Sequence, residues 1–276
     1  MTHAAKRVTP ETVAAFHRDG AVALRGLFSA EDMANLARGI EENLADPSPQ
    51  AKIASSPEDP GRFFEDFRNW TRIAAYERFV RDSPLAEAAA RLMRSPTARF
   101  YHDHLLVKTP GTRQRTPWHQ DQPYYNVEGA QTVSFWIPID PVSRLSTLEF
   151  VARSHLGPWL MPRTFRDHQA QWFPEGALAD LPDIEKDRSA FDILGWALAP
   201  GDAVAFSMLT LHGAAGVPGE GQRRVFSARF LGEDVRHAPR QWATSPDFPE
   251  LSHLPAGAPM DHPIFPVLWR ADGAIF

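Results

Sequence analysis

The sequence predicts a mainly β protein with flanking helices, in which a helical first part leads into a β-barrel or jelly roll. Helix-start and helix-stop signals fall within residues 1–98, and short segments of alternating polarity follow from about residue 99. The chain also has 25 prolines among 276 residues, which favours a loop-rich β architecture over a helical bundle. This length suits one all-β domain, so we expect a single domain over residues 1–276.

Residues 1–98 carry the helix signals. Thr9 as N-cap and Pro10 at the first helical position predict a helix that Gly20 ends. Ser29, with Asp32 three residues on, predicts the capped start of a second helix. Further predictions are a short strand over residues 21–24, a loop over 46–61, and helices over 70–79 and after Ser83-Pro84.

The second half of the chain carries the strand signals. We predict a jelly-roll core over residues 99–232, with an irregular insertion at 156–200, and a packed C-terminal tail at 233–276. The predicted strands cover residues 99–107, 131–137, 147–152, 203–210 and 223–231.

Composition excludes several classes of protein. The chain has no cysteine, so disulfides and thiolate metal sites are excluded, and any metal must be held by His, Asp or Glu. The net charge is −5 and no basic stripe stands out, which argues against a nucleic-acid partner. No apolar run reaches membrane-spanning length, and residues 1–8 lack the apolar region of a signal peptide. We therefore expect a cytoplasmic protein with a small-molecule substrate, while its oligomeric state stays open.

The first candidate metal site is Trp118-His119-Gln120-Asp121. In an extended segment residues i and i+2 point to the same side, so His119 and Asp121 would present an imidazole and a carboxylate to one space. These are two of the three ligands of a facial triad, which leaves positions open on an Fe(II) ion. The pair alone is a weak signal, because a surface histidine beside a solvated aspartate looks the same in sequence.

The second candidate is His212, which follows the predicted strand 203–210 and precedes Gly-Ala-Ala-Gly. Such a histidine could sit at the mouth of a barrel. Considered alone, it is better explained as a strand-end residue hydrogen-bonded to a loop carbonyl.

The third candidate is the strand that begins at Arg223. With period two, Arg223, Ser227 and Arg229 share one face, and Phe226 and Phe230 share the other. An arginine inside a barrel needs an anion, and its planar guanidinium suits a carboxylate, to which the Ser227 hydroxyl could also bind. The alternative is an edge strand with solvated arginines.

Together these signals meet one chemical requirement. An iron ion needs three protein ligands, here His119, Asp121 and His212. 2-Oxoglutarate chelates iron through its keto-acid end, and its far carboxylate needs a cation one co-substrate length away, for which Arg223 is the candidate. The combination predicts a non-haem dioxygenase that uses Fe(II), 2-oxoglutarate and O2.

The chain resembles the phytanoyl-CoA dioxygenase family, whose members include ectoine hydroxylase and phytanoyl-CoA hydroxylase. The likeness extends from roughly Thr9 to Arg236. It rests on the segments Phe100 to Lys108, Thr116 to Asp121, Ser134 to Trp136, Leu148 to Val151 with Ser154-His155, and Leu211 to Arg229.

This resemblance implies a double-stranded β-helix (the cupin-like jelly roll) with flanking helices. It gives His119, Asp121, His212 and Arg223 the roles assigned above. It also implies that Trp136, and with it His104, lines the co-substrate pocket.

The chain departs from its relatives at three places, of which the first two lie at turns. Ser146-Thr147 stands where many relatives have Asn-Gly, and Arg153 stands where many have a glycine, whose conformational freedom is usual there. Ala214 replaces a small hydroxyl residue two positions after the distal histidine, which removes one co-substrate hydrogen bond. Asp121 matters differently, because relatives that halogenate carry a small residue at that position. The carboxylate predicts hydroxylation, with desaturation, ring closure and epimerisation as other outcomes.

Two rival functions remain at this point. A jelly-roll enzyme with another metal and no 2-oxoglutarate would not need Arg223 inside the barrel, and a non-catalytic binding protein would not need the triad. His102 and His104 share a strand face and form a competing metal pair, which we place beside the site because no carboxylate joins them. The roles of Arg229, Tyr124 and Tyr125 stay open, as does that of Trp172, which lies outside the residues described below.

Overall fold

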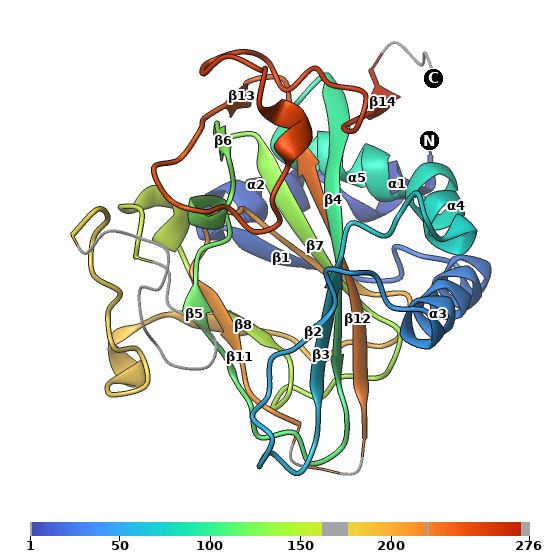
Figure 1. Ribbon diagram of the computed structural model, residues 1–276, viewed down its shortest axis with the longest axis vertical. Helices are drawn as coiled ribbons and strands as arrows, with labels where there is room; N and C mark the ends of the chain where they lie inside the picture. The colour runs from blue at the N-terminus through green and yellow to red at the C-terminus, as the bar shows by residue number, and fades with distance from the viewer. Residues whose placement is uncertain (1, 162–175, 218, 220, 272–276) are drawn as a thin grey trace.

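The computed structural model describes residues 2–161, 176–217, 219 and 221–271. Two antiparallel sheets face each other, and the helices lie against the outer side of the larger one (Figure 1). The larger sheet has the order β1-β10-β7-β12-β4-β3-β2, with β14 paired to β4, and the smaller has the order β5-β11-β8-β9. The fold is therefore mainly β with flanking helices, in the jelly-roll arrangement that the sequence predicts.

The helices and strands have the following bounds. The α-helices are α1 His3–Arg7, α2 Pro10–Asp19, α3 Ala30–Ala45, α4 Ala74–Asp82 and α5 Leu85–Met93. The strands of the larger sheet are β1 Ala21–Leu24, β2 Lys52–Ile53, β3 Phe63–Phe67, β4 Thr97–Lys108, β7 Thr132–Pro138, β10 Ala203–Phe206, β12 Arg223–Leu231 and β14 Val267–Arg270. The remaining strands are β5 Thr116–His119, β6 Val127–Glu128, β8 Leu148–Val151, β9 Ile193–Gly195, β11 His212–Ala214 and β13 Arg236–His237.

The predicted ends of the first two long helices are confirmed. Thr9 caps α2 by accepting a hydrogen bond from the Thr12 amide, and Gly20 ends it with a φ of 84°. Ser29 and Asp32 form a reciprocal capping box at the start of α3. These caps determine where the chain enters β1 and leaves α3.

The helix predicted over residues 70–79 is displaced, because α4 begins only at Ala74. The buried Asp103 carboxylate accepts hydrogen bonds from the amides of Asn69 and Trp70, and this holds the preceding segment in a turn. Sequence could not show this, because Asp103 lies on β4, more than thirty residues later.

The predicted strand 203–210 is too long, since β10 ends at Phe206. The next residues turn, with the Thr210 amide bonded to the Ser207 carbonyl. The carbonyl of Met208 then accepts hydrogen bonds from the amides of Asp121 and Gln122, over 2.8 and 2.9 Å. The residues after Phe206 that we predicted as strand therefore form the turn that positions Asp121.

Several strands escaped prediction. β3 lies in the part expected to be mostly helical, because its Phe63-to-Phe67 run lacks clear alternation. The tail, expected as packed coil, contains β13 and β14, and β14 extends the larger sheet by pairing with β4. Each of these strands depends on pairing with another strand that is distant in sequence, which only the folded chain supplies.

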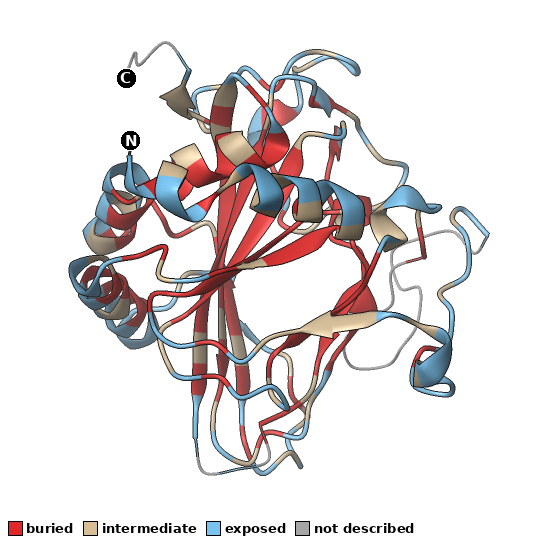
Figure 2. Ribbon diagram, turned by 180° about the vertical axis from the view of Figure 1, so that it is seen from behind, coloured by how far each residue is buried: buried red, intermediate tan, exposed pale blue. Residues whose placement is uncertain are grey.

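The larger sheet separates two cores. Phe226, Ala228 and Phe230 of β12 point to the helices, where Phe226 contacts the ring of Tyr76 at 4.7 Å between centroids. The alternate residues of β12 point between the two sheets, as period two predicts. Figure 2 shows the strands buried along most of their length, while the helices expose one side. Among the described helices, none is long and apolar enough to cross a lipid bilayer.

Candidate active site

His119 and His212 are directly opposite each other on the antiparallel strands β5 and β11. Their ring centroids lie 4.2 Å apart. Asp121 follows β5 in the turn held by the Met208 carbonyl. One ligand atom from each of the three buried side chains lies within 4.8 Å of the others. The structure therefore brings together the residues predicted to hold the metal.

The hydrogen bonds of these side chains prepare them to bind a divalent ion. Nδ1 of His119 donates to the Pro117 carbonyl and Nδ1 of His212 to the Thr210 carbonyl, each over 2.8 Å. This tautomer leaves Nε2 as the unprotonated nitrogen of each ring, and both Nε2 atoms lie 3.7 Å from Oδ1 of Asp121. Two neutral imidazoles and one carboxylate are the donor set of a facial triad, so these residues fit an Fe(II) ion.

Electrostatics favours the same protonation states. Burial, reinforced by the neighbouring His119, lowers the pKa of His212 to about 3. Burial would raise the pKa of Asp121, but Arg229 and the two histidines hold it well below its usual value. His212 and Asp121 are thus free of competing protons near neutral pH.

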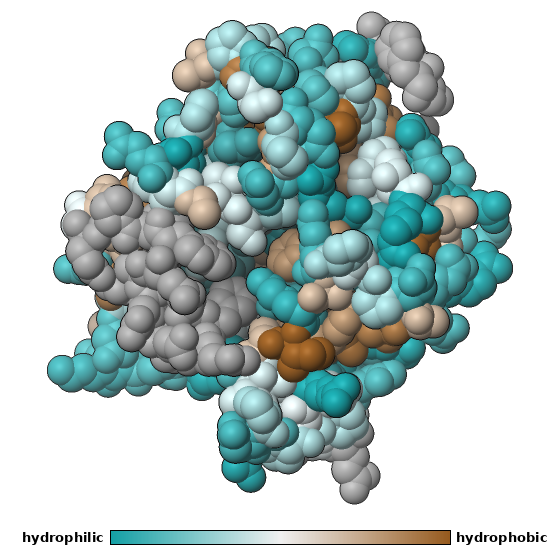
Figure 3. Space-filling model, in the orientation of Figure 1, coloured by the Kyte–Doolittle hydropathy of each residue, from teal (hydrophilic) through white to brown (hydrophobic). Residues whose placement is uncertain are grey.

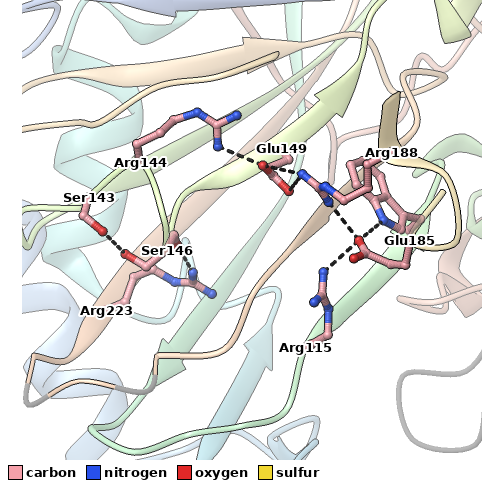
Figure 4. A network of polar contacts seen from close by, with 9 residues as sticks. Arg115, Ser143, Arg144, Ser146, Glu149, Glu185, Arg188 and Arg223 are labelled. Atoms are coloured by element: carbon pink, nitrogen blue, oxygen red, sulfur yellow. Dashed lines mark hydrogen bonds and ion pairs between the residues drawn. The ribbon is translucent and has the colours of Figure 1, made fainter. Parts of the chain in front are cut away.

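Arg223 projects from β12 into the same cavity and is 6% exposed. It donates to the Ser146 carbonyl (Figure 4) and to that of Ala215. Its guanidinium lies 5.6 Å from the centre of the Trp136 ring. Burial lowers its pKa to about 10. No carboxylate among the described residues forms an ion pair with it, so this arginine suits an anion from outside the protein.

The cavity has a volume of about 370 Å³ and lies between the two sheets. The triad, Arg223 and Trp136 line it, and so do His104, Tyr124, Tyr125 and Arg229. Figure 3 shows hydrophobic side chains gathered on the face where Figure 1 draws β2 and β3, and β2 contributes to the cavity lining. The cavity is large enough for a co-substrate and a small organic molecule together.

Two residues expected near the site have protein partners. The Ser227 hydroxyl lines the cavity, but it donates to the Phe135 carbonyl over 2.9 Å and accepts from Arg229 over 3.1 Å. His102 is buried behind the cavity wall, with its ring 5.0 Å from that of Tyr125. His102 and His104 do not belong to the metal-binding group found among the described residues.

Sequence reasoning missed two charged residues of the wall. Glu65 on β3 is 1% exposed and its Oε1 lies 3.0 Å from Nε2 of His104. Lys108 ends β4 and donates to the carbonyls of Gln114 and Ala215. An acid within an apolar run and a lysine at the end of a buried strand are the signals that could have revealed them.

A network of charged side chains supports the site from outside. Glu185 accepts hydrogen bonds from Arg115, Arg188 and the Trp118 indole, each over 2.9 or 3.0 Å (Figure 4). Arg188 also binds Glu149 of β8. The network joins the insertion to the strands on either side of β11, so it braces the sheet that carries both histidines.

Comparison with solved structures shows the same fold elsewhere. The carbocyclase SnoK from nogalamycin biosynthesis, described as non-haem and α-ketoglutarate-dependent, is 22% identical, with a TM-score of 0.76 over 96% of this chain and 98% of SnoK. The epimerase SnoN, in complex with Fe3+, α-ketoglutarate and nogalamycin RO, is 19% identical, with a TM-score of 0.73 over 93% of this chain and 97% of its own. EctD from S. alaskensis, with 2-oxoglutarate and 5-hydroxyectoine, is 19% identical, with a TM-score of 0.65 over 88% of this chain and 82% of EctD.

The family follows from the sequence itself, since the model of the phytanoyl-CoA dioxygenase family (PhyH) matches residues 16–225. The chain belongs to this family. No curated protein matches the chain significantly. As a phytanoyl-CoA dioxygenase family member with an intact triad, it is an Fe(II)- and 2-oxoglutarate-dependent dioxygenase. The non-catalytic alternative is thereby excluded.

Proposed function

We propose that this dioxygenase hydroxylates an aliphatic C–H bond of a small-molecule metabolite or natural-product intermediate, with release of succinate and CO2. The observation that carries the proposal is the triad with a carboxylate, in one cavity with a buried arginine that forms no ion pair with any carboxylate of the described residues. Two structures of similar fold, SnoK and SnoN, are described as enzymes of nogalamycin biosynthesis, which supports a natural-product substrate.

The proposed roles follow from the positions of the side chains. His119, Asp121 and His212 would hold the iron, and Arg223 beside Trp136 would bind the far carboxylate of 2-oxoglutarate. Bound iron and co-substrate supply the oxidant that removes a hydrogen atom from the substrate. Ser227 and His104 are the remaining predicted contacts of the co-substrate pocket, and both line the cavity.

The protein contributes position and exclusion of water. Phe206, Leu148 and Val225 close the cavity between the two sheets with apolar surface. Such walls keep water from the reacting centre and strengthen the attraction between Arg223 and a carboxylate.

An anaerobic titration of Fe(II) and 2-oxoglutarate into the apoprotein, followed in the visible spectrum, tests the cofactor roles. The wild type should show a metal-to-ligand charge-transfer band, and His119→Ala should lose it. Arg223→Ala should need about 100-fold more 2-oxoglutarate while keeping its iron. Arg224→Ala is the matched control, because Arg224 points to the other side of β12 and pairs with Asp140.

Product mass then tests the reaction. Hydroxylation adds one oxygen atom to the substrate, desaturation or ring closure removes two hydrogens, and epimerisation leaves the mass unchanged. A protein that purifies with zinc, shows no band with Fe(II), and binds 2-oxoglutarate equally well with and without Arg223 would overturn the proposed function.

A further inference from the structure

Glu65 is a buried carboxylate with one oxygen unsatisfied. Its Oε1 is hydrogen-bonded to His104, but its Oε2 has no hydrogen-bond partner in the described part of the chain. Lys52 lies 3.7 Å from Oε2, on a side chain that is 47% exposed. A buried carboxylate oxygen without a hydrogen bond is unfavourable, and Glu65 lines the cavity. Glu65 therefore keeps an acceptor that a hydrogen-bond donor bound in the cavity could satisfy.

His104 provides a second acceptor beside Glu65. Burial lowers the pKa of His104 to about 4, so the ring is neutral near pH 7 and its Nε2–H donates to Glu65. Nδ1 then carries the lone pair, and it has no hydrogen-bond partner among the described residues. The ring is held flat against Phe67, with centroids 3.9 Å apart and planes 20° apart. Glu65 and His104 thus form a fixed pair of acceptors.

The register of the larger sheet places His104 one interior row from the residues that contact Asp121. His104 is opposite Ser227, while Arg229 and Ser134, one interior row further along the same sheet, contact Asp121. Neighbouring rows are separated by about 7 Å along a strand. Glu65 is opposite Leu106, so it lies one row further from Arg229 than His104 does, and one row from Lys108 and Arg223. A molecule bound to both Glu65 and His104 must therefore span about two rows to reach the iron site.

The co-substrate end lies on the other side of β12. Arg223 turns toward Ser146 and Trp136, whereas Glu65 belongs to β3, beyond β4. The Glu65 carboxylate would also repel the dianion 2-oxoglutarate. The two acceptors are thus available to the substrate.

Charge favours a neutral donor over a cationic one. Besides Glu65 and Asp121, the cavity is lined by four basic side chains, Lys52, Lys108, Arg223 and Arg229. Burial lowers the pKa of Lys108 well below its usual value, but the other three cations alone outnumber the two carboxylates. The charges of an Fe(II) ion and a 2-oxoglutarate dianion cancel, so their binding leaves this excess of positive charge unchanged. The excess positive charge would repel an ammonium group and weaken its binding, whereas it would not repel a neutral hydroxyl group.

We propose that Glu65 and His104 bind a hydroxyl group of the substrate, and that the substrate is accordingly a hydroxylated, largely apolar molecule. This assignment rests on the function proposed above and gives the His104 ring to the substrate instead of the co-substrate. Aromatic side chains near the pair, Phe67 and Tyr124, supply the apolar part of the site.

Three matched probes test the proposal on anaerobic protein loaded with Fe(II) and 2-oxoglutarate. Naphthol carries a neutral donor, naphthyl methyl ether lacks it, and naphthylmethylammonium carries a cationic donor. We expect the wild type to bind naphthol about tenfold more tightly than the ether, as one hydrogen bond to a charged acceptor predicts. Calorimetry gives the three dissociation constants.

Variants then assign the preference to the pair. Glu65→Gln and His104→Phe should each bring the naphthol-to-ether ratio to within about threefold, and the phenyl ring keeps the stack on Phe67. Glu58→Gln is the matched control, because Glu58 is exposed and does not line the cavity, and it should keep the wild-type ratio. Should His104→Phe fail to fold, Glu65→Gln alone decides.

Two results would overturn the proposal: equal affinity of the wild type for naphthol and the ether, or an unchanged ratio in both variants. Tightest binding of the ammonium probe would overturn the choice of a neutral hydroxyl. The charge-transfer band separates these failures from failure of the proposed function. A wild type with the band but without the naphthol preference contradicts only this inference.

Discussion

Ser134 donates a hydrogen bond from its Oγ to Oδ2 of Asp121 over 2.8 Å. Nη2 of Arg229 lies 3.3 Å from the same oxygen. The other oxygen of Asp121, Oδ1, lies 3.7 Å from Nε2 of His119 and of His212. Two residues of the larger sheet therefore orient a carboxylate that follows a strand of the smaller one, and they select which of its oxygens faces the metal position.

Removing this contact should weaken iron binding. We expect Ser134→Ala to lower Fe(II) affinity about 10- to 100-fold, because the carboxylate loses the partner that orients it. An anaerobic metal titration measures the effect. Thr132→Val is the control, since the Thr132 hydroxyl is buried on the same strand and no described residue forms a hydrogen bond with it. Equal affinities of wild type and Ser134→Ala would show that the hydrogen bond does not serve the metal.

Ala214 offers a gain-of-affinity test at the co-substrate end. It lies two residues after His212 on β11 and lines the cavity. Ala214→Ser should lower the dissociation constant for 2-oxoglutarate about threefold to tenfold by adding one hydrogen bond. Calorimetry on metal-loaded protein measures it, with Ala214→Cys as a control of similar size whose thiol is only a weak hydrogen-bond donor. Unchanged binding in Ala214→Ser would place the co-substrate away from this wall.

His104 should make the apoprotein sensitive to acid. Burial lowers its pKa to about 4, against 6.5 for a free histidine, so the unfolded chain takes up the proton first as pH falls. The stabilisation is fully present above pH 6.5 and is lost progressively toward pH 4. At pH 5.5 the loss from this group is about 1 kcal/mol.

Urea denaturation of the apoprotein at pH 7 and 5.5 measures this loss. His104→Phe should show a smaller decrease in unfolding free energy between the two pH values than the wild type. His253→Phe, at an exposed position, should behave like the wild type. Identical decreases in wild type and His104→Phe would contradict a neutral buried imidazole.

Arg153 adopts a backbone conformation that favours glycine. Its φ is 66°, at a turn where the sequence comparison already expected glycine. A residue with a Cβ costs about 1–2 kcal/mol in this region. We expect Arg153→Gly to be about 1 kcal/mol more stable than Arg153→Ala, because both lose the exposed ion pair with Asp192 and only glycine relieves the strain. Thermal or chemical unfolding compares the two, and equal stabilities would refute the strain.

Local patterns were the most predictable features. The interior and exterior faces of residues 223–231 follow from alternation along one strand, and the observed strand has these bounds. The helix caps at Thr9 and Ser29 likewise depend on residues three positions apart. Features that rest on distant partners were missed, as the late start of α4, held by Asp103, and the pairing of β14 with β4 show.

The sequence by itself determined the chemistry of the centre: a His119-x-Asp121 pair, a distal His212, and Arg223 on the inward face of a strand. These follow from residue type and short-range spacing. Only the tertiary structure decided that His119 and His212 pair across two strands, that Ser134 orients Asp121, and that Glu65 meets His104. Such contacts join segments far apart in the chain, and they depend on strand register and sheet packing, which no short stretch of sequence specifies.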